Sequence, residues 1–302
     1  MNEKLRGSVE MTAAMAILGT IGWFVVLSGQ PVIDVVFWRC AFGAATLLVI
    51  CAAMGLLRGR LSPRTLGLAA LGGVAIVANW LLLFGAYGHA SISIATAVYN
   101  TQPFMLVGFG ALFFGERITL AKLFWLALAF GGMLLIVEAK AAGEVRGTDY
   151  LIGIVMALGA AFLWAVASVV AKMLKGTPPQ LIALIQVCVG VLMLAPAADF
   201  SQLPVDPWSW TMLAALGVVH TGLIYILMYS AIQKLPTPLQ GALSFVYPVV
   251  AILVDMVAFG HRLQPSQFLG AAAILFAAAG MTLGWVPWRR KAPAAEARRL
   301  RV

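Results

Sequence analysis

Apolar residues occur in ten long runs, separated by short segments that carry most of the polar and charged residues. The runs are roughly 11–27, 33–57, 66–87, 92–114, 120–137, 150–173, 180–197, 210–232, 239–259 and 267–286. Most of them approach the roughly 20 residues that a helix needs to cross a bilayer. Because the backbone inside a bilayer must be hydrogen-bonded within helices, the pattern predicts an all-α membrane protein with ten transmembrane helices.

Composition agrees with this class of protein. The chain is 62% hydrophobic and 10% charged, with a mean hydropathy of +0.98, which leaves too little polar surface to cover a soluble protein. The three cysteines, Cys40, Cys51 and Cys188, lie in apolar runs without paired spacing, so we expect no disulfide, metal or cofactor. The sequence contains no His-Glu-x-x-His, nucleophile-elbow or Walker motif, and we do not expect an enzyme.

The chain contains an internal duplication. A segment around Tyr99-Asn100-Thr101-Gln102-Pro103 leads to Phe114-Gly115-Glu116-Arg117, and a similar segment ends at Phe259-Gly260-His261-Arg262. A constant offset of 145 residues relates Ala97 to Ala242, Pro103 to Pro248, Phe114 to Phe259 and Arg117 to Arg262. We therefore divide the chain into a first five-helix repeat (1–138), an outer loop (139–149), a second five-helix repeat (150–286) and a basic tail (287–302).

An odd number of helices in each half makes the two halves run in opposite directions. Such inverted repeats surround a central cavity in many secondary transporters, where two similar halves exchange conformations. A self-contained duplication of this kind also favours a functional monomer. The sequence thus predicts a carrier; a pore or a non-transporting membrane subunit is the alternative from another class.

Positive charge predicts the orientation. If the N-terminus is cytoplasmic, every lysine and arginine except Arg39, Lys140, Arg146 and Arg262 lies in an inner segment or in the C-terminal tail. Both termini are therefore expected on the cytoplasmic side. The net charge of +9 then reflects topology and contact with anionic lipid headgroups, not nucleic-acid binding. We expect the first run to be retained, because its removal as a signal peptide would delete a helix of the first repeat.

These features resemble the drug/metabolite transporter superfamily, and specifically its ten-helix EamA-type exporters. The resemblance depends on Trp38-Arg39 and on the proline-bearing segment 96–114 closed by Gly115-Glu116-Arg117, together with the second copy of that unit. The second-half glutamate that is usual in the family is His261 here, so a role for that acid does not carry over to this half. The resemblance implies an inner-membrane exporter of small metabolites, often amino acids.

Within that family the chain is most similar to exporters of aromatic and other amino acids. The resemblance implies that Trp23 and Trp164 line the cavity, as do residues of the proline-bearing helices. The tryptophan that precedes the first-half proline in that group is Gln102 here.

Polar groups within apolar runs provide an independent set of site candidates, because they are costly in a membrane unless they are paired or face water. The polar residues near the middle of the runs are Asn79, Asn100, Thr101, Gln102, Ser168, Gln186, His220, Tyr225 and Tyr247. From these we select Asn79, Asn100, Gln102, His220 and Tyr247 as site candidates and add Trp80. Hydrogen bonding between helices explains the amides and His220 equally well. Pro103 and Pro248 are expected to bend their helices and to free carbonyl groups at a similar depth.

Arg39 and Asp255 are the two charged residues well inside the apolar runs. They predict either a structural ion pair, with snorkelling toward the outer interface, or an outer gate that opens when the pair breaks. The chain has no ATPase domain, and its first run contains no acidic residue. Facilitated diffusion is therefore the leading mechanism, and proton coupling through His220 or Asp255 is the alternative.

Overall fold

The structure, a computed structural model, describes residues 2–59, 61–90, 95, 98–138, 148–201, 203–259 and 264–287. Every regular element among these residues is a helix. The helices are α1 (Glu3–Leu18), α2 (Ile21–Ser28), α3 (Val32–Ala53), η1 (Leu56–Arg58), α4 (Pro63–His89), α6 (Gln102–Phe114), α7 (Leu120–Glu138), α8 (Thr148–Met173), α9 (Pro179–Leu194), α10 (Pro207–Gly217), η2 (Val218–Leu223), α11 (Ile224–Lys234), α12 (Thr237–Ser244), α13 (Val246–Phe259) and α14 (Pro265–Leu283).

Six helical segments of the described chain are long and apolar enough to cross a membrane, namely Glu3–Val25, Val32–Ala53, Pro63–Ala86, Tyr150–Met173, Pro207–Lys234 and Pro265–Leu283. Three shorter apolar helices are Gln102–Phe114, Leu120–Ile136 and Pro179–Leu194. Each predicted run overlaps at least one helix, so the all-helical class is confirmed. The count of ten spans and their inverted arrangement stay predictions.

Local sequence signals fix several helix ends. Ser62 precedes Pro63 and its hydroxyl accepts a hydrogen bond from the Thr65 amide at 3.1 Å, as expected for an N-cap followed by proline. Gly115 ends α6 in the left-handed conformation, with φ of 63°. That conformation disfavours a residue with a Cβ, which explains the glycine in the Gly115-Glu116-Arg117 motif.

Two of the predicted spans are interrupted near their middle. The first span breaks between α1 and α2 at Gly19, where a Cβ would lie 2.6 Å from Cβ of Val250 on α13. The eighth run passes through η2, a π-helical turn between α10 and α11. Hydropathy alone did not predict these breaks, because the residues around them are as apolar as the rest of the run.

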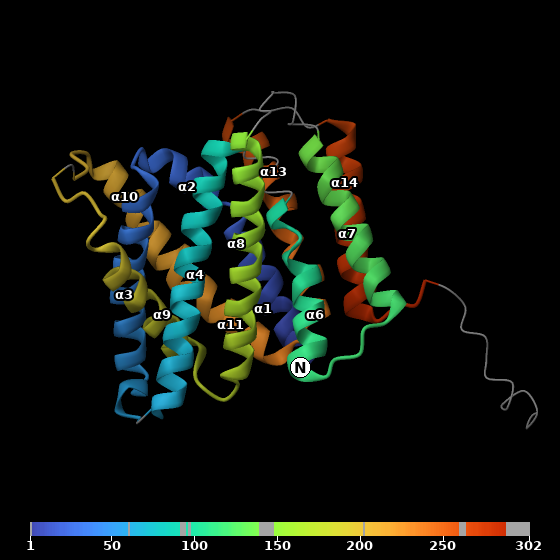
Figure 1. The fold of residues 1–302 in the computed structure, drawn as a ribbon, viewed down its shortest axis with the longest axis horizontal. Helices are drawn as coiled ribbons and strands as arrows, with labels where there is room; N and C mark the ends of the chain where they lie inside the picture. The colour runs from blue at the N-terminus through green and yellow to red at the C-terminus, as the bar shows by residue number, and fades with distance from the viewer. Residues whose placement is uncertain are drawn as a thin grey trace, which may run out of the picture.

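The pairs of helices that pack together have the symmetry expected from the duplication. The most extensive pairs include α4 with α8, α7 with α14, α3 with α9, α1 with α11 and α6 with α12. The duplication matches α1 with α8, α3 with α9, α4 with α11, α6 with α12 and α7 with α14. If each helix is replaced by its match, the α4–α8 pair becomes the α11–α1 pair. The α3–α9, α6–α12 and α7–α14 pairs stay the same. The α7–α14 pair stands at one edge of the bundle (Figure 1).

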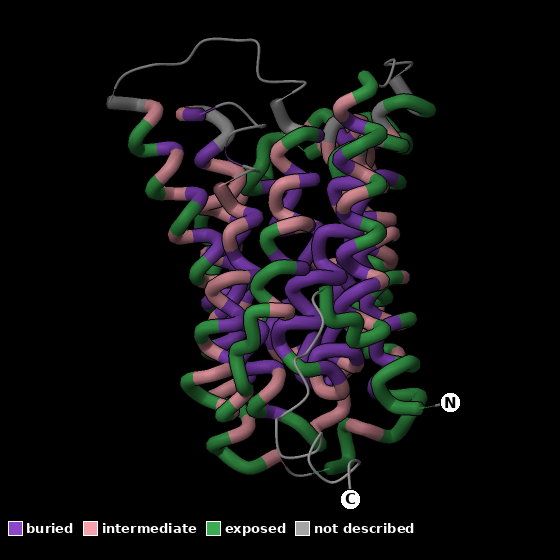
Figure 2. The backbone as a smooth tube through the Cα atoms, turned by 90° about the vertical axis from the view of Figure 1, so that its right-hand side faces the viewer, coloured by how far each residue is buried: buried purple, intermediate pink, exposed green. Residues whose placement is uncertain are grey.

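Burial is concentrated in the middle of the bundle, where the helices face one another (Figure 2). The outside of the bundle keeps many large apolar side chains exposed, such as Val155 at 67% and Leu192 at 76%. An apolar exterior of this extent is unfavourable in water and suits contact with lipid.

Candidate functional site

A cavity of about 310 Å³ lies between the helices of both halves. Its walls come from α1 to α4, from α6 and the residues before it, and from α8, α11, α12 and α13. Most of the lining is aliphatic or aromatic, with a small number of polar groups. This volume and this lining are typical of a site for a small organic ligand.

The cavity brings together five of the predicted residues. Arg39, Trp80, Gln102, Trp164 and Tyr247 all contribute to its lining. They lie on five different helices and come from both halves of the chain. The tertiary structure thus forms one site from positions up to 208 residues apart in the sequence.

Arg39 is the one cation that lines this cavity within the described chain, and it is 2% exposed. Its Nε donates to the hydroxyl of Thr221 at 2.8 Å, and its Nη2 donates to the His220 carbonyl at 3.2 Å. The guanidinium carbon lies 4.2 Å from the ring centroid of Trp80, which places the cation over the π-face of the indole. Arg39 therefore links α3 to η2 and α4. Asp255 belongs to α13, but its side chain lies outside the described part of the structure, so their pairing stays a prediction.

The predicted amides have different positions. Asn79 is fully buried outside the lining, and its Nδ2 donates to the Ala160 carbonyl at 2.7 Å, which ties α4 to α8. Asn100 is also buried, at 1% exposed, and does not line the cavity. Gln102 lines the cavity at 6% exposed, and its Oε1 has no hydrogen-bond partner among the described residues.

His220 bridges the two helix interruptions. Its Nε2 lies 2.8 Å from the hydroxyl of Thr20, which follows the break at Gly19, and Phe24 packs 4.7 Å from its ring. The residue is 1% exposed and is not part of the cavity lining. Of its two interpretations, a histidine bonded between helices is the one that this geometry favours.

Three further predicted residues lie beside the cavity lining. Trp23, for which the resemblance implied a place in the cavity wall, is not one of the lining residues and packs edge-to-face on Phe24 at 5.0 Å. Pro103 stands in the first turn of α6, and Pro248 stands in the first turn of α13, directly after the break between α12 and α13. A proline in a first turn removes an amide that has no helical partner, so these prolines mark helix starts at little cost.

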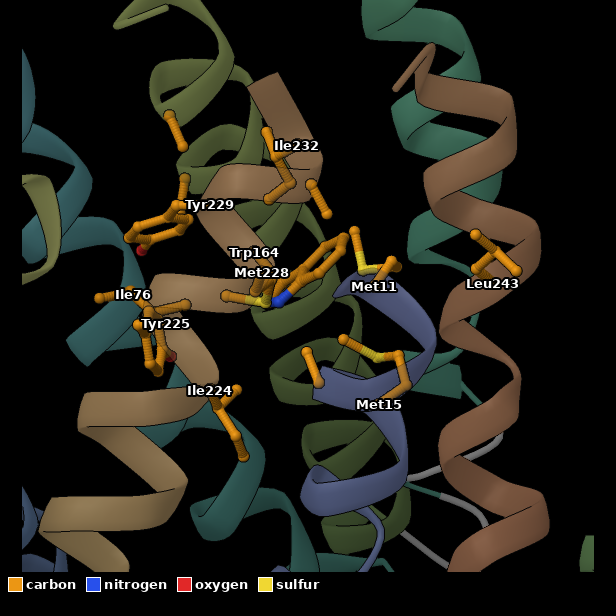
Figure 3. Close-up of a cluster of buried hydrophobic side chains, with 14 of the residues drawn as sticks. Met11, Met15, Ile76, Trp164, Ile224, Tyr225, Met228, Tyr229, Ile232 and Leu243 are labelled. Carbon is orange, nitrogen blue, oxygen red and sulfur yellow. The ribbon is translucent and has the colours of Figure 1, made fainter. Parts of the chain in front are cut away.

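Buried hydrophobic side chains pack together at the end of the cavity that lies toward the N-terminal end of the bundle. Trp164 and Met228 point toward Met11 and Met15 between the helices (Figure 3). All four are buried, with Met11 0% and Met15 2% exposed. Leu243, on α12, lies to one side of Met11 and Met15 (Figure 3). We call Met11, Met15, Trp164, Met228 and Leu243 the hydrophobic plug.

Two ion-pair clusters lie beyond the hydrophobic plug, at the N-terminal end of the bundle. In the first, Lys234 at the end of α11 bonds both carboxylate oxygens of Glu10 on α1, at 2.6 and 2.7 Å. In the second, Glu116 accepts from Lys172 Nζ at 2.5 Å and from the Thr237 hydroxyl at 2.8 Å. Each cluster joins the first half of the chain to the second at this end of the bundle.

The second cluster also sets the charge of Glu116. Burial raises the pKa of this carboxyl, but the hydrogen bonds from Lys172 and Thr237 outweigh burial, so that the pKa lies below its ordinary value of 4.5. Glu116 is therefore charged at neutral pH. In the sequence Glu116 stands out only as part of the Gly115-Glu116-Arg117 motif, and nothing there predicts that it links the end of α6 to α8 and α12.

Several residues that line the cavity were not among the predicted site residues. Met15, Tyr99, Tyr225, Met228 and Ser244 all line the cavity. Tyr225 stood among the polar residues of the eighth run, and its ring centroid lies 6.0 Å from that of Trp80. Met15 and Met228 are apolar in apolar runs, so no sequence signal distinguishes them from residues that face lipid.

A bundle of apolar, membrane-length helices around a ligand-sized cavity has the architecture of a membrane transporter. The sequence model of the EamA-like transporter family matches residues 7–138 and 151–283 of this chain. The chain belongs to the EamA-like transporter family, within the drug/metabolite transporter superfamily, and is a multi-pass membrane protein. The family is one of transporters, not of enzymes.

Similar proteins include named exporters. An uncharacterized transporter of Bacillus subtilis (strain 168) is 28% identical over 96% of this chain and 93% of its own length. An aromatic amino acid exporter of Ancylobacter novellus is 26% identical over 66% of this chain and 70% of its length. A threonine/homoserine exporter of Escherichia coli (strain K12) is 28% identical over 64% of this chain and 63% of its length.

A solved crystal structure shares the fold. It superimposes with a TM-score of 0.81 and covers 92% of this chain and 98% of its own, at 23% sequence identity.

Proposed function

We propose that this transporter exports small metabolites, chiefly amino acids with aromatic and other side chains, across the bacterial inner membrane by alternating access. The observation that carries the proposal is the cavity, in which aromatic walls from Trp80 and Trp164 accompany one cation, Arg39, and one amide, Gln102. Such a lining accommodates an apolar side chain and offers polar partners for a small ligand. The names of the aromatic amino acid exporter and the threonine/homoserine exporter support amino acids as the substrate class.

Alternating access is supported by the way the two halves meet. The exchange of helix pairs between the halves is the packing expected of two inverted five-helix repeats around a central site. The cavity rim includes Val25 and Val32, beside the α2–α3 connection, whereas the hydrophobic plug and both ion-pair clusters lie toward the opposite end of α1. The alternate state then requires both clusters and the plug to separate.

The orientation in this proposal follows from the distribution of lysine and arginine. With both termini cytoplasmic, the closed end faces the cytoplasm and the cavity rim faces outward. The basic tail, 287–302, lies outside the described residues except for its first position, and we propose that it contacts anionic lipid headgroups. We propose a monomer as the functional unit, because both repeats of the duplication belong to one chain.

Facilitated diffusion is the mechanism that we propose. His220, the histidine considered for proton coupling, lies outside the cavity lining and is bonded between helices. A facilitator runs in whichever direction the substrate gradient points, so export describes the usual gradient and not a fixed direction.

Counterflow in proteoliposomes tests the proposal. Liposomes loaded with unlabelled phenylalanine, threonine, methionine or lysine would be diluted into trace labelled amino acid, with and without an imposed proton gradient. We expect saturable uptake that depends on the preloaded amino acid and not on the proton gradient. Dependence on the proton gradient would instead favour a proton-coupled efflux carrier. Absence of counterflow with every amino acid would contradict the substrate class, and non-saturable flux would favour a pore.

A further inference from the structure

The cavity lining includes a buried cation, Arg39, for which the described side chains provide no anionic partner. Arg39 is 2% exposed, and no carboxylate among the described side chains pairs with it. A buried charge that lacks a counterion is unfavourable unless other groups compensate for the lost hydration. The Thr221 hydroxyl, the His220 carbonyl, the Trp80 ring and the Tyr225 hydroxyl, which also hydrogen-bonds to Arg39, compensate in part, but all of them are uncharged.

The contacts of Arg39 with Thr221, His220 and Tyr225 hold its guanidinium in place and are fewer than its N–H donors. Arginine has five N–H donors in a rigid fork. Thr221 and His220 accept from one Nε and one Nη2 group, which fixes the head group against η2, while Trp80 covers one face. A planar cation that is held on one edge and one face, and that also lines a cavity, is preorganised to bind a planar anion from the cavity side.

The same cavity contains an unused acceptor. Gln102 is 6% exposed, lines the cavity, and its Oε1 has no hydrogen-bond partner among the described residues. A buried amide oxygen in that condition gains from a ligand that brings a donor. The cavity therefore offers a group that binds an anion, a group that binds a donor, and apolar walls from Trp164 and Met228.

We propose that Arg39 binds the carboxylate of the substrate and that Gln102 Oε1 accepts from its ammonium group, so that the transporter selects α-amino acids over amines and amides. This inference rests on the proposed function and assigns its polar contacts. It replaces the structural or gate role first considered for Arg39 with direct recognition of the substrate. The substrate carboxylate then supplies the counterion of Arg39 that none of the described side chains provides.

Binding selectivity tests the inference without depending on transport. Intrinsic tryptophan fluorescence of the purified full chain would be titrated with L-phenylalanine, with phenylalaninamide, which lacks the carboxylate, and with 3-phenylpropionate, which lacks the ammonium. We expect the wild type to prefer phenylalanine to phenylalaninamide by about 10- to 100-fold, the range for a charge-assisted contact. Arg39→Gln should abolish this preference, and Gln102→Leu should bring the affinity for phenylalanine close to that for 3-phenylpropionate.

Other variants guard against misfolding and against an indirect effect. Arg39→Lys keeps the charge and loses the fork, so an intermediate preference is expected; Thr221→Val removes the bond that orients Arg39 and should reduce the preference without altering the cavity wall. Trp164→Phe is the matched control, because it changes a wall and should lower the affinities for all three ligands together.

Three outcomes would overturn the inference. An equal loss of affinity for all three ligands in Arg39→Gln would indicate a structural role. A loss of selectivity in Asp255→Asn equal to that in Arg39→Gln would indicate that these residues pair with each other. A wild type that binds phenylalanine and phenylalaninamide equally would also contradict the proposal. A wild type that binds phenylalanine selectively but shows no counterflow would contradict the proposed transport and leave the carboxylate site standing.

Discussion

Replacing Glu116 by glutamine tests whether the ion-pair clusters hold one end of the transporter closed. The change keeps the size of the side chain but removes the charge that Lys172 neutralises and weakens the bond from Thr237. The side chains of Lys172 and Glu116 are 14% and 16% exposed, so the pair lies between a surface pair and a buried one. Surface pairs contribute about 0–1 kcal/mol and breaking buried pairs costs about 3–5 kcal/mol, so we expect about 1–2 kcal/mol here.

That free energy sets the expected shift in conformation. If the Glu116 cluster forms only while this end is closed, a loss of about 1–2 kcal/mol raises the population that is open at this end by about 5- to 30-fold. Met15 reports this population, since it is 2% exposed in the hydrophobic plug and lies on the path from that end to the cavity. A Met15→Cys substitution in a Cys188→Ser background provides a thiol for a membrane-impermeant maleimide, because Cys40 and Cys51 are buried.

Labelling would be followed from each side separately, in inside-out and right-side-out vesicles. We expect Glu116→Gln to accelerate labelling from the N-terminal side by about 5- to 30-fold. Glu3→Gln is the matched control, because it removes an exposed carboxylate at the first turn of α1 and should leave the rate unchanged. If Glu116→Gln lowers the thermal stability but labels at the wild-type rate, the cluster stabilises the fold without controlling access, and the reasoning is refuted.

Three further predictions follow from individual contacts. Trp164→Ala should lower substrate affinity in counterflow by about 10-fold or more, because Trp164 forms a cavity wall, whereas Trp23→Ala should change it little; equal effects would contradict the assigned lining. Gly270→Ala should destabilise the protein by about 1–3 kcal/mol in thermal unfolding, because a Cβ there would lie 2.4 Å from a backbone oxygen of α7, while Gly131→Ala has open space and should be neutral. Since the folded pKa of Glu116 is lowered, its stabilisation is complete above pH 4.5 and is lost as pH falls through the lowered value; the acid-induced fall in stability should be smaller in Glu116→Gln.

The sequence was sufficient to place the helices and to predict their class. Each apolar run overlaps a helix, because about 20 apolar residues in a row have few stable conformations other than a helix in lipid. Four of the substrate-site candidates, Trp80, Gln102, Trp164 and Tyr247, line the cavity, and so does Arg39, for which the sequence predicted an ion pair or a gate. The sequence also showed the 145-residue offset between Pro103 and Pro248, because the start of a helix depends on local residues such as proline.

Only the tertiary structure decided which of these residues face the cavity. Gln102 and His220 are both polar residues in apolar runs, yet Gln102 lines the cavity while His220 bonds to Thr20 across two helix breaks. In a soluble helix the polar face would indicate the solvent side, but here lipid and protein interior are equally apolar, so the sequence does not distinguish the faces of a helix. Met15 and Met228 show the limit of the sequence, because their place in the site depends on the packing of α1 against α11, which the apolar pattern of either run does not determine.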